Sequence, residues 1–464
     1  MNQFRPFHDS LYDFAQVQPS WWEASTDRST YTEFGPTACD VKCEVAIIGG
    51  GYTGLSAAYH LAREYDIDVV VLEAGAIGWG ASGRNGGFCA MGGTLLGARQ
   101  IAKTYGLEEA RRFYAVQREA VELVGALADD EGFEIDRQGE AELTVAEKPA
   151  HYDALEEECS FLKDQLGVSC RMIPKGAFRE TQYNAPHVYG ALAMEPGFGL
   201  HPLKYCLGLG DAAARAGARI FSKSEVTRWD KAASTSGNRH QLQTQTGHTI
   251  SAEKVIVACN GFMPETLNKQ FTSRILPLQS QIIVTRALSA DERAAHGWKM
   301  EHPAINSRNV YFYYRMLPDG RFMIGGRADT KGTPQGAEVS AENLAAAMRR
   351  LWPEWQHVDI EHAWRGLVCF TGNLHPSLGR IEDDPSVYFG FGYHGNGVNN
   401  ATWAGRELAR WLATGNDRKT PSPDHLPALY RGMTRRIPFA ALRPTYARLG
   451  IGFHQLKDRF DGIR

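Results

Sequence analysis

Between residues 44 and 74 the spacing of apolar residues changes from that of a strand to that of a helix and back to that of a strand. This pattern predicts the first elements of the chain. The run EVAIIGG is short and rich in β-branched residues, GYTGLSAAYHLAREY has apolar residues at helical spacing, and DIDVVVLEA is a second short apolar run. A strand, a helix and a strand within about 30 residues form a βαβ unit. We therefore predict two strands joined by a helix here.

The rest of the chain mixes helical and strand-like periods, with no internal repeat. Helical spacing predicts helices at 99–130, 150–166, 201–217, 341–351 and 398–415. Short apolar runs predict strands in ARIFSKSEV, RHQLQTQTG, KVIVACNG, LQSQIIVTRAL, VYFYYRML, RFMIGGR and SVYFGFGYHG. Between Trp364 and the last of these strands the pattern predicts a loop.

These blocks interleave along 464 residues, which is more than one hydrophobic core usually supports. We predict an α/β fold of two domains. A Rossmann-like nucleotide-binding domain is assembled from discontinuous segments, and a mostly antiparallel β-sheet domain for the substrate is inserted into it. The predicted divisions are an N-terminal arm at 1–40, the nucleotide-binding domain at 41–98, 195–275 and 356–430, the inserted domain at 99–194 and 276–355, and a basic helical tail at 431–464.

Composition and charge restrict the class of protein. Apolar residues make up 43% and charged residues 22%, as in ordinary soluble globular proteins, and the net charge of -3 lacks the basic excess of a nucleic-acid binder. No apolar run reaches about 20 residues, and the polar start MNQFRPFHDS lacks a signal-peptide core. The eight cysteines include no pair at the two-residue spacing of a zinc or redox motif. We expect a cytoplasmic protein with reduced, mostly buried thiols and no metal site.

Both ends of the chain allow more than one interpretation. Trp21 and Trp22 are expected to anchor the arm against the body by burial, with partner binding as the alternative. The tail from Arg431 carries many arginines, few acids and apolar residues at near-helical spacing. It predicts either a terminal helix pair packed on its own protein with an arginine-rich outer face, or an element that docks to a membrane surface or a partner.

The run GGGYTG, residues 49–54, follows the first strand and opens the first helix, as a dinucleotide-binding G-x-G-x-x-G turn does. Gly49 permits the tight turn, Gly51 lets the backbone approach a pyrophosphate, and Gly54 lets the helix pack close to the strand. The helix N-terminus offers unpaired N–H groups to the phosphates. Glu73 ends the second strand, where a carboxylate accepts hydrogen bonds from the adenosine ribose and disfavours NADP. This motif alone leaves FAD and NAD both open.

The glycine-rich stretch LEAGAIGWGASGRNGGF after the second strand helps to distinguish the two cofactors. Together with VIVACNG, PLQSQIIVT, LPDGRFMIGGR, GLVCFTGNLHPSLGR and FGYHGNGVNNATWAGRELA, in that order, it resembles the amine and amino-acid oxidase family of FAD proteins. The resemblance spans about residues 44–415, nearly the whole chain. Within that family, the form GASGRNGG is most similar to the γ-glutamylputrescine oxidases.

The resemblance implies a non-covalently bound FAD and assigns residues to its parts. The ADP half would contact Gly49, Gly51, Tyr52, Thr53, Gly54, Glu73, Ala74, Val226 and Gly261. The ribityl chain and isoalloxazine would lie beside Gly80, Ala81, Ser82, Arg84, Asn85, Gly86 and Gly87. The pyrimidine end would meet Gly395, Asn396, Gly397 and Val398 at the start of the last helix. That helix dipole would stabilise the negative charge that forms there on reduction.

One position departs from the pattern that the resemblance implies. Where some members of the family hold an arginine that binds the substrate α-carboxylate, and others a cysteine that attaches the flavin, this chain has Val368. Valine can do neither, and Cys369 would point to the opposite face of an extended strand. A carboxylate on the substrate, if there is one, is therefore expected far from the reacting amine.

The resemblance also suggests residues for the substrate side. The predicted catalytic or substrate-contacting residues are Tyr314, Arg327 and His394, and each has a purely structural role as its alternative. Further candidate cations are Arg315 and Arg365. Gln279 and Gln281 stand on the strand that offers a lysine to oxygen in some members, so the lack of a lysine leaves oxygen reactivity open.

The activity implied is FAD-dependent oxidation of a C–N bond in an amine, such as a γ-glutamylputrescine-like conjugate or an N-substituted amine. Hydride would pass from the carbon next to an uncharged amine nitrogen to flavin N5, and the imine would hydrolyse. Electrons would then go to O2, with release of hydrogen peroxide, or to another acceptor. The alternatives are a dehydrogenase that serves a membrane or protein acceptor, a flavin subunit of a hetero-oligomer that is inactive alone and, more distantly, an NAD enzyme.

Overall fold

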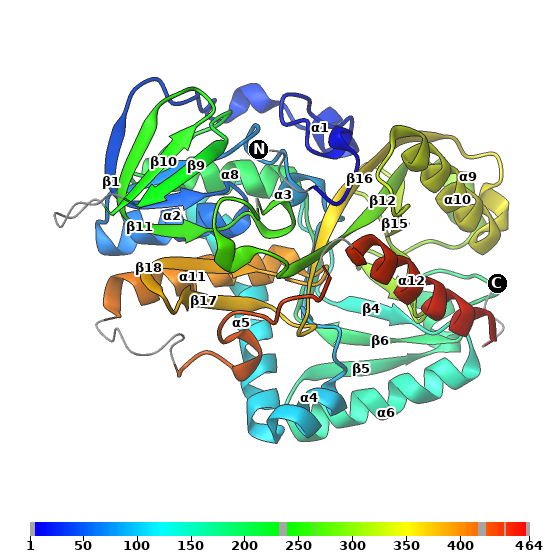
Figure 1. Cartoon of the computed structure of the whole chain (residues 1–464). Coiled ribbons are helices and arrows are strands. Elements are labelled where there is room, and N and C mark those ends of the chain that lie inside the picture. Colours follow the sequence, from blue (N-terminus) through cyan, green and yellow to red (C-terminus); the bar gives the residue numbers. More distant parts are fainter. Residues whose placement is uncertain (1–4, 232–238, 264, 416–423, 440–441, 461–464) are drawn as a thin grey trace.

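The computed structural model describes residues 5–231, 239–263, 265–415, 424–439 and 442–460 (Figure 1). Two large β-sheets form the frame of the molecule, one parallel in its centre and one almost wholly antiparallel. The predicted α/β fold, with a Rossmann-like part and a mostly antiparallel sheet, is confirmed.

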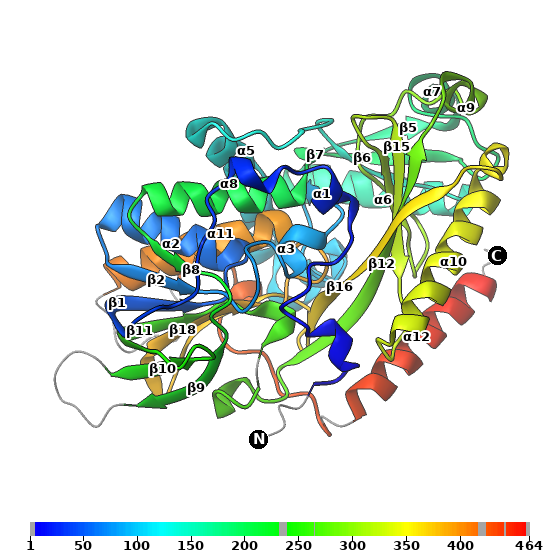
Figure 2. The same ribbon diagram turned by 90° about the horizontal axis from the view of Figure 1, so that it is seen from above.

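The first sheet has the strand order β17-β18-β11-β1-β2-β8, and β10 and β9 extend it from β11. Its central strands pair in parallel, while β17 returns antiparallel to β18. Helices α2, α8 and α11 pack together over one face (Figure 2). The elements are β1 (Val41–Ile48), α2 (Tyr52–Tyr65), β2 (Val69–Leu72), α8 (Pro202–Arg215), β8 (Arg219–Phe221), β9 (Val226–Lys231), β10 (His240–Thr244), β11 (Thr249–Val257), β17 (Ser377–Ile381), β18 (Asp384–Phe391) and α11 (Gly397–Thr414).

The second sheet has the order β16-β12-β15-β14-β13-β4-β6-β5 and is antiparallel except at the β13–β4 pair. Alternate residues of its strands enter a core with the large buried rings of Trp352, Trp355 and Phe178 on the face away from the first sheet. Its strands are β4 (Glu142–Val145), β5 (Ser169–Pro174), β6 (Gly190–Glu195), β12 (Ile275–Ala287), β13 (Ala304–Asn306), β14 (Tyr313–Met316), β15 (Arg321–Arg327) and β16 (Ile360–Thr371). Its helices are α6 (Pro149–Leu166), α7 (Lys175–Thr181), α9 (Ala290–Ala295) and α10 (Pro334–Leu351).

A few short elements connect the two sheets. The glycine-rich stretch forms α3 (Ala81–Arg84) and then β3 (Phe88–Ala90), which pairs antiparallel with β7 (Gly197–Gly199). Helix α5 (Leu107–Glu131), preceded by α4 (Ala98–Tyr105), packs against both α11 and α6. The glycine-rich stretch thus lies where the two halves of the molecule meet.

The loop predicted after Trp364 is wrong, because these residues belong to strand β16. Gly366 interrupts the apolar run in the sequence, but β12 supplies a full ladder of backbone partners along the strand. Its burial alternates, as expected for a strand with two different faces. The predicted nucleotide-binding segment begins at residue 356, yet β16 lies in the second sheet. We propose that this boundary falls after Thr371.

The N-terminal arm is held by buried contacts. Trp22 in α1 (Trp21–Ala24) is 2% exposed, and its indole Nε1 donates to the carbonyl of Asn85 at 2.9 Å. The ring of Trp21 packs 5.2 Å from that of His362. The expected anchoring by burial is confirmed for Trp22, whereas Trp21 is half-buried in its contact with His362.

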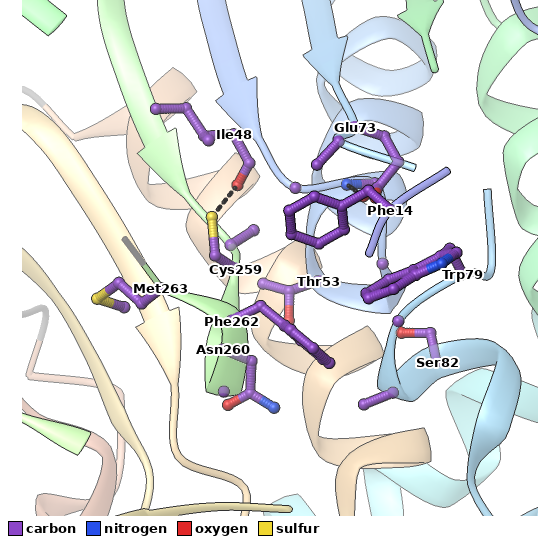
Figure 3. A pocket seen from close by; sticks show the side chains of 18 of the residues that line it. Phe14, Ile48, Thr53, Glu73, Trp79, Ser82, Cys259, Asn260, Phe262 and Met263 are labelled. Atoms are coloured by element: carbon purple, nitrogen blue, oxygen red, sulfur yellow. Dashed lines mark hydrogen bonds between the residues drawn. The ribbon is translucent and has the colours of Figure 1, made fainter. Parts of the chain in front are cut away.

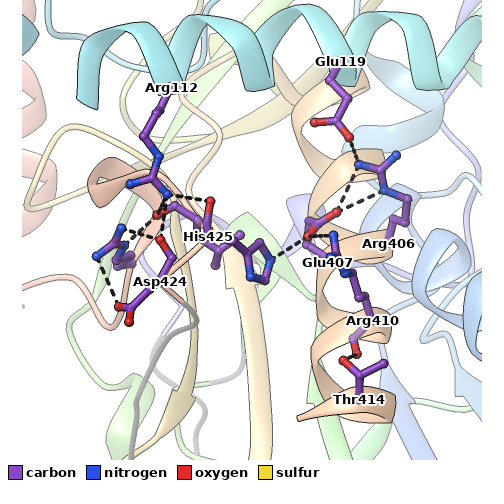
Figure 4. A network of polar contacts seen from close by, with 10 residues as sticks. Arg112, Glu119, Arg406, Glu407, Arg410, Thr414, Asp424 and His425 are labelled. Atoms are coloured by element: carbon purple, nitrogen blue, oxygen red, sulfur yellow. Dashed lines mark hydrogen bonds and ion pairs between the residues drawn. The ribbon is translucent and has the colours of Figure 1, made fainter. Parts of the chain in front are cut away.

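Charged side chains tie the segment before the tail to the first domain (Figure 4). Arg112 of α5 donates to the carbonyls of Asp424 at 2.7 Å and His425 at 2.9 Å. The imidazole of His425 lies 3.0 Å from a carboxylate oxygen of Glu407, which also pairs with Arg406 on α11. This network sets the path of the chain as it leaves α11.

The tail ends in one helix, α12 (Arg443–Phe460), within the described residues, and not in the expected helix pair. It lies against the outside of the second domain, beside α10 (Figures 1 and 2). No helix in the part of the chain that the structure describes is long and apolar enough to cross a membrane.

Candidate active site

A cavity of about 1250 Å³, counted to its open mouth, lies at the carboxyl ends of β1 and β2 (Figure 3). Such a position beyond the strand ends is typical of ligand sites in parallel sheets. Eleven of the predicted cofactor residues line it, namely Gly49, Gly51, Tyr52, Thr53, Glu73, Ala74, Gly80, Ala81, Ser82, Val226 and Gly261. These eleven are about a third of the 31 residues that line the cavity.

The glycine turn is packed so closely that side chains would not fit. Gly49 has φ +108°, a left-handed value that favours glycine, and a Cβ there would lie 2.8 Å from the Ala258 carbonyl oxygen. A Cβ on Gly51 would lie 2.8 Å from the hydroxyl of Ser82, which accepts a hydrogen bond from the Tyr52 N–H at 3.0 Å. A Cβ on Gly54 would overlap the carbonyl of Gly49, so α2 can pack on the turn only with glycine there.

Glu73 lies in the cavity with its carboxylate already oriented. One oxygen accepts from the Gly50 N–H at 2.7 Å and the other from the Gly75 N–H at 2.9 Å. Burial raises the pKa of Glu73, and these backbone donors act in the opposite direction. The remaining lone pairs of the carboxylate can accept from ligand hydroxyls.

Arg84 is a buried cation beside this cavity. Its side chain is 5% exposed, its guanidinium lies 4.1 Å from the centre of the Trp79 ring, and its Nη2 has no hydrogen-bond partner among the described residues. Burial lowers the pKa of Arg84 to about 9. An unsatisfied buried donor next to a phosphate-type turn fits a missing anionic or polar group of a ligand.

Asn85 braces the glycine-rich stretch from within. Its amide nitrogen donates to the Ala81 carbonyl at 3.1 Å, and its amide oxygen accepts from the Gly87 N–H at 2.8 Å. The buried guanidinium of Arg315 donates to the Gly86 carbonyl at 3.2 Å. These contacts hold the backbone of residues 85–87 in place for a ligand to lie against it.

The predicted flavin-end residues occupy the turn before α11. Gly395 has φ +95°, Asn396 is the N-cap residue, Gly397 begins the helix, and Val398 is buried in the core. The side chain of Asn396 donates to the Ala90 carbonyl at 2.8 Å and does not cap the helix. Among the described residues the first N–H groups of α11 therefore have no side-chain acceptor, whereas in α2 the Tyr52 N–H donates to the Ser82 hydroxyl.

These residues fit a dinucleotide with a flavin. Neither α2 nor α11 is capped by the side chain of its own N-cap residue, and the glycines leave no room for side chains. With the oriented carboxylate of Glu73 and an Arg84 Nη2 that has no partner among the described residues, these groups suit phosphates, ribose hydroxyls and a flat ring system. FAD would be held by these groups without a covalent bond, because Val368 occupies the attachment position and Cys369 is 2% exposed in the core of the first domain.

The N-terminal arm also lines the cavity, which the sequence did not reveal. Phe14 packs 4.6 Å from Trp79, whose indole Nε1 donates to the carbonyl of Gln16 at 2.7 Å. Tyr12 packs 6.3 Å from Phe262, and Arg5 lies 3.8 Å from Glu225. The arm has no regular period, so no local pattern could have placed it there.

The candidate substrate side of the site is the face of the second sheet that looks toward the first domain. Tyr313 lies on this face, with its hydroxyl 2.8 Å from that of Ser280 and its ring 2.9 Å from where a Cβ on Gly86 would be. A Cβ on Gly395 would lie 3.9 Å from Val368 and 3.6 Å from the hydroxyl of Tyr311. The glycine-rich stretch and the turn before α11 therefore face the same wall of side chains.

Arg327 lies on the same face with no acidic partner. Arg327 belongs to the set of alternate residues in β15 that face the first domain. Its guanidinium lies 5.9 Å from the centre of the Phe370 ring. Burial lowers the pKa of Arg327, and the described residues provide no hydrogen-bond acceptor or carboxylate for it. It is thus a desolvated cation available to a ligand.

Glu142 is a second ionisable side chain on this face that has no partner among the described residues, and the sequence did not identify it. The neighbouring Leu143 and Val145 enter the core of the second domain, so Glu142 lies on the opposite face of β4. It interacts electrostatically with Tyr311 and has no hydrogen-bond or ion-pair partner among the described residues. Burial raises its pKa to about 8. Its position in a run of alternating residues, AELTV, was the only available signal.

Comparison with known proteins agrees with the geometry. The model of the family described as "FAD dependent oxidoreductase" matches residues 44–411. The chain belongs to this family. The γ-glutamylputrescine oxidoreductase of Escherichia coli (strain K12) is 30% identical over 446 residues, which cover 95% of this chain and 98% of that protein.

Two further proteins are similar to this FAD-dependent oxidoreductase. The probable oxidoreductase OrdL of Rhizobium meliloti (strain 1021) is 30% identical over 453 residues, which cover 95% of this chain and 97% of that protein. The crystal structure of glycine oxidase from Geobacillus kaustophilus superimposes with a TM-score of 0.67 at 22% identity, covering 86% of this chain and all of that one. The latter likeness supports the fold alone.

The structure corrects the prediction that Tyr314 contacts substrate. Tyr314 is 1% exposed, its hydroxyl lies 2.7 Å from that of Tyr183, and its ring packs 5.1 Å from Trp352 on the outer face of the second sheet. Adjacent strand residues point to opposite faces, so Tyr313 is the tyrosine that faces the glycine-rich stretch, beside Gly86. The sequence identified the strand but not which of its two faces meets the cofactor side.

The other candidates have structural partners. His394 is 5% exposed, with Nε2 3.2 Å from the Thr371 hydroxyl, and burial lowers its pKa to about 3, which favours the packing role. Arg315 braces the glycine-rich stretch, and Arg365 donates to the Thr333 carbonyl and to Ser10 of the arm. Gln279 bonds Asp329 at 2.9 Å and Gln281 bonds the Ile282 carbonyl at 3.2 Å.

Proposed function

We propose that this oxidoreductase oxidises a C–N bond in an amine that carries a carboxylate far from the reacting nitrogen, as a γ-glutamylputrescine-like conjugate does. Arg327 is the observation that carries the proposal, because it is a desolvated cation without an acidic partner on the wall that faces the cofactor side. The position at which some relatives bind an α-carboxylate holds Val368 beside Gly395. Carboxylate recognition is therefore displaced from the reacting end of the substrate.

When bound, FAD supplies the two-electron acceptor for this oxidation. The side chains of the protein bind and orient the substrate, because Arg327 can pair with its carboxylate in a fork of two hydrogen bonds. Val368 and Tyr311 provide a wall beside Gly395 that excludes water from the reacting carbon. Glu142 offers an oxygen to a substrate N–H or ammonium group.

The overall reaction removes a hydride from the carbon and a proton from the nitrogen of the amine. The imine product then takes up water and splits into a carbonyl compound and ammonia or a smaller amine. We propose O2 as the final electron acceptor, with hydrogen peroxide as the product, and the cytoplasm as the location.

The test is anaerobic mixing of the FAD-loaded enzyme with matched amines while the flavin absorbance is followed. The panel contains γ-glutamylputrescine, its analogue with the carboxylate replaced by an amide, N-acetylputrescine and free α-amino acids. We expect bleaching by the carboxylate-bearing conjugate and a loss of about 100-fold or more in kcat/KM for it in Arg327→Gln, since a charged fork contributes several hydrogen bonds. Bleaching by free α-amino acids alone would contradict the proposal.

A dehydrogenase is the second candidate, and strand β12 favours it. The resemblance implies that some relatives present a lysine to oxygen from this strand, and β12 contains no lysine. If the enzyme is a dehydrogenase, an artificial dye is reduced rapidly by the amine while oxygen consumption is negligible. A flavin that no amine bleaches would instead indicate a subunit that is inactive alone.

A further inference from the structure

Helix α12 presents an apolar stripe to solvent. Leu449, Phe453 and Leu456 are 67%, 66% and 51% exposed, and their spacing of four and three residues places them on one face of the helix. Leu442 and Phe439, just before the helix, are 46% and 77% exposed. We call these five side chains the tail face. A row of large apolar side chains in water is a feature of interaction surfaces.

The opposite side of the helix is held by polar contacts. Arg443 is 1% exposed, forms an ion pair with Glu265 and donates to the Ile275 carbonyl at 2.9 Å. At the other end, the Asp458 carboxylate accepts from the N–H groups of Asn309 at 2.9 Å and Val310 at 3.1 Å. Turning the helix about its axis would break a buried ion pair, which is strongly unfavourable. The polar contacts therefore keep the apolar stripe pointed outward.

The exposed charged side chains of the described part of the tail itself have one sign. Arg435, Arg436, Arg448 and Lys457 are exposed. Asp458 is the one carboxylate in the described part of the tail from Arg431 onward, and it is turned inward. The described side chains that α12 exposes to solvent are thus mainly apolar and basic.

We propose that the tail face binds an anionic lipid surface, with the apolar stripe at the level of the headgroups and the basic side chains beside the lipid phosphates. A helix that combines Leu and Phe on one face with Lys and Arg around it is typical of interfacial membrane binding. A second copy of this chain fits less well, because a two-fold contact through this face would bring the same basic side chains together. The proposal is independent of the amine that the enzyme oxidises.

The same helix connects this surface to the active site. Asp458 holds the loop of Asn309 and Val310, and the next residue is Tyr311, which faces Gly395. The membrane contact would therefore lie on the side of the molecule that carries the substrate wall.

The test is co-sedimentation of the full-length, FAD-loaded enzyme with vesicles. One set contains phosphatidylglycerol and phosphatidylcholine, and the other contains phosphatidylcholine alone. We expect at least about tenfold tighter binding to the anionic vesicles, with most of it lost at high salt, because salt screens the attraction. Equal binding to both sets, or no binding to the anionic set, would overturn the proposal.

Two variants separate the contributions of the tail face. Leu449→Ser with Phe453→Ser removes the centre of the stripe, and Arg435→Gln with Lys457→Gln removes two exposed charges. Each is expected to weaken anionic-vesicle binding by about tenfold or more, since both insertion and charge contribute. The matched control, Val17→Ser with Leu95→Ser, removes side chains that are 45% and 52% exposed elsewhere and should bind as the parent does.

FAD content and amine oxidation should be unchanged in all of these variants, which shows that they fold. If the parent forms a dimer that Leu449→Ser with Phe453→Ser dissociates, and binds no vesicles, the tail face is a self-contact. If it instead captures an acidic protein without binding lipid, it serves a protein partner. Either result overturns the membrane proposal.

Discussion

Tyr313 and Tyr314 are neighbours in β14 and face opposite sides of the second sheet. The hydroxyl of Tyr313 meets Ser280 at 2.8 Å on the side of the glycine-rich stretch, and that of Tyr314 meets Tyr183 at 2.7 Å in the outer core. The two side chains thus make similar hydrogen bonds in different parts of the enzyme.

Because the two side chains lie in different parts of the enzyme, replacing each tyrosine with phenylalanine is predicted to affect activity differently. Tyr313→Phe and Tyr314→Phe should each lower the free energy of unfolding by about 1 kcal/mol, the usual contribution of one hydrogen bond. Only Tyr313→Phe should also lower kcat/KM, by about tenfold, since it changes the wall over the cofactor side. Urea unfolding and steady-state kinetics on both variants check this, and an activity loss confined to Tyr314→Phe would show that the assignment of faces is wrong.

Trp79 is predicted to control retention of the cofactor. Its ring is 2% exposed, contacts Arg84 and Phe14 in the lining of the cavity, and its indole holds the arm through Gln16. Trp79→Ala should raise the Kd for FAD by about tenfold or more, because it removes both a stacked ring and the closure by the arm. Flavin fluorescence during dilution measures this. The matched control is Trp21→Ala, which disturbs the arm outside the cavity and should leave the Kd within about twofold.

A side chain at position 51 is predicted to meet two obstacles, one from the protein and one from the cofactor. In Gly51→Ala the new Cβ would lie 2.8 Å from the hydroxyl of Ser82 and would also block the approach of the pyrophosphate. Adding Ser82→Ala should restore most of the thermal stability of the apoprotein but not FAD binding. Recovery of both properties in the double variant would mean that the cofactor does not approach this glycine.

Glu142 is predicted to make stability depend on pH. Burial raises its pKa to about 8, so between its ordinary value and pH 8 the folded protein keeps a proton that the unfolded chain has released. Stability should therefore fall as the pH rises through this window. Glu142→Gln should leave the melting temperature nearly unchanged at about pH 5 and raise it by about 2 °C or more at about pH 9. A shift of equal size at both pH values would contradict the raised pKa.

Much of the nucleotide half could be read from the sequence because its determinants are local. Gly49, Gly51 and Gly54 act within one turn of chain, and Glu73 follows at the end of the next strand. The spacing of apolar residues in 44–74 predicted two strands and a helix, and the structure contains them. The motifs in the order of the family also led to FAD.

The substrate side could not be read in the same way. Arg327 was named from the sequence, but so was Tyr314, because a short apolar run does not show which face of a strand meets the other domain. Glu142 had no motif to mark it. Gly366 interrupts the alternation of apolar residues, so the sequence pattern did not indicate strand β16. Only the pairing of this strand with β12 defines it.

The sequence by itself determined the βαβ unit and the glycine turn, since each depends on residues close together in the chain. It also determined membership of a flavin family, through short local motifs in a fixed order along residues 44–411. The tertiary structure alone decided that the arm closes the cavity, that Tyr313 and not Tyr314 faces the cofactor side, and that α12 turns its apolar residues outward. These outcomes depend on contacts between segments far apart in the chain, such as Trp22 with Asn85, which are 63 residues apart, or Glu265 with Arg443, which are 178 residues apart. No local period contains that information, because the free energy of those contacts is defined only when the whole chain has packed.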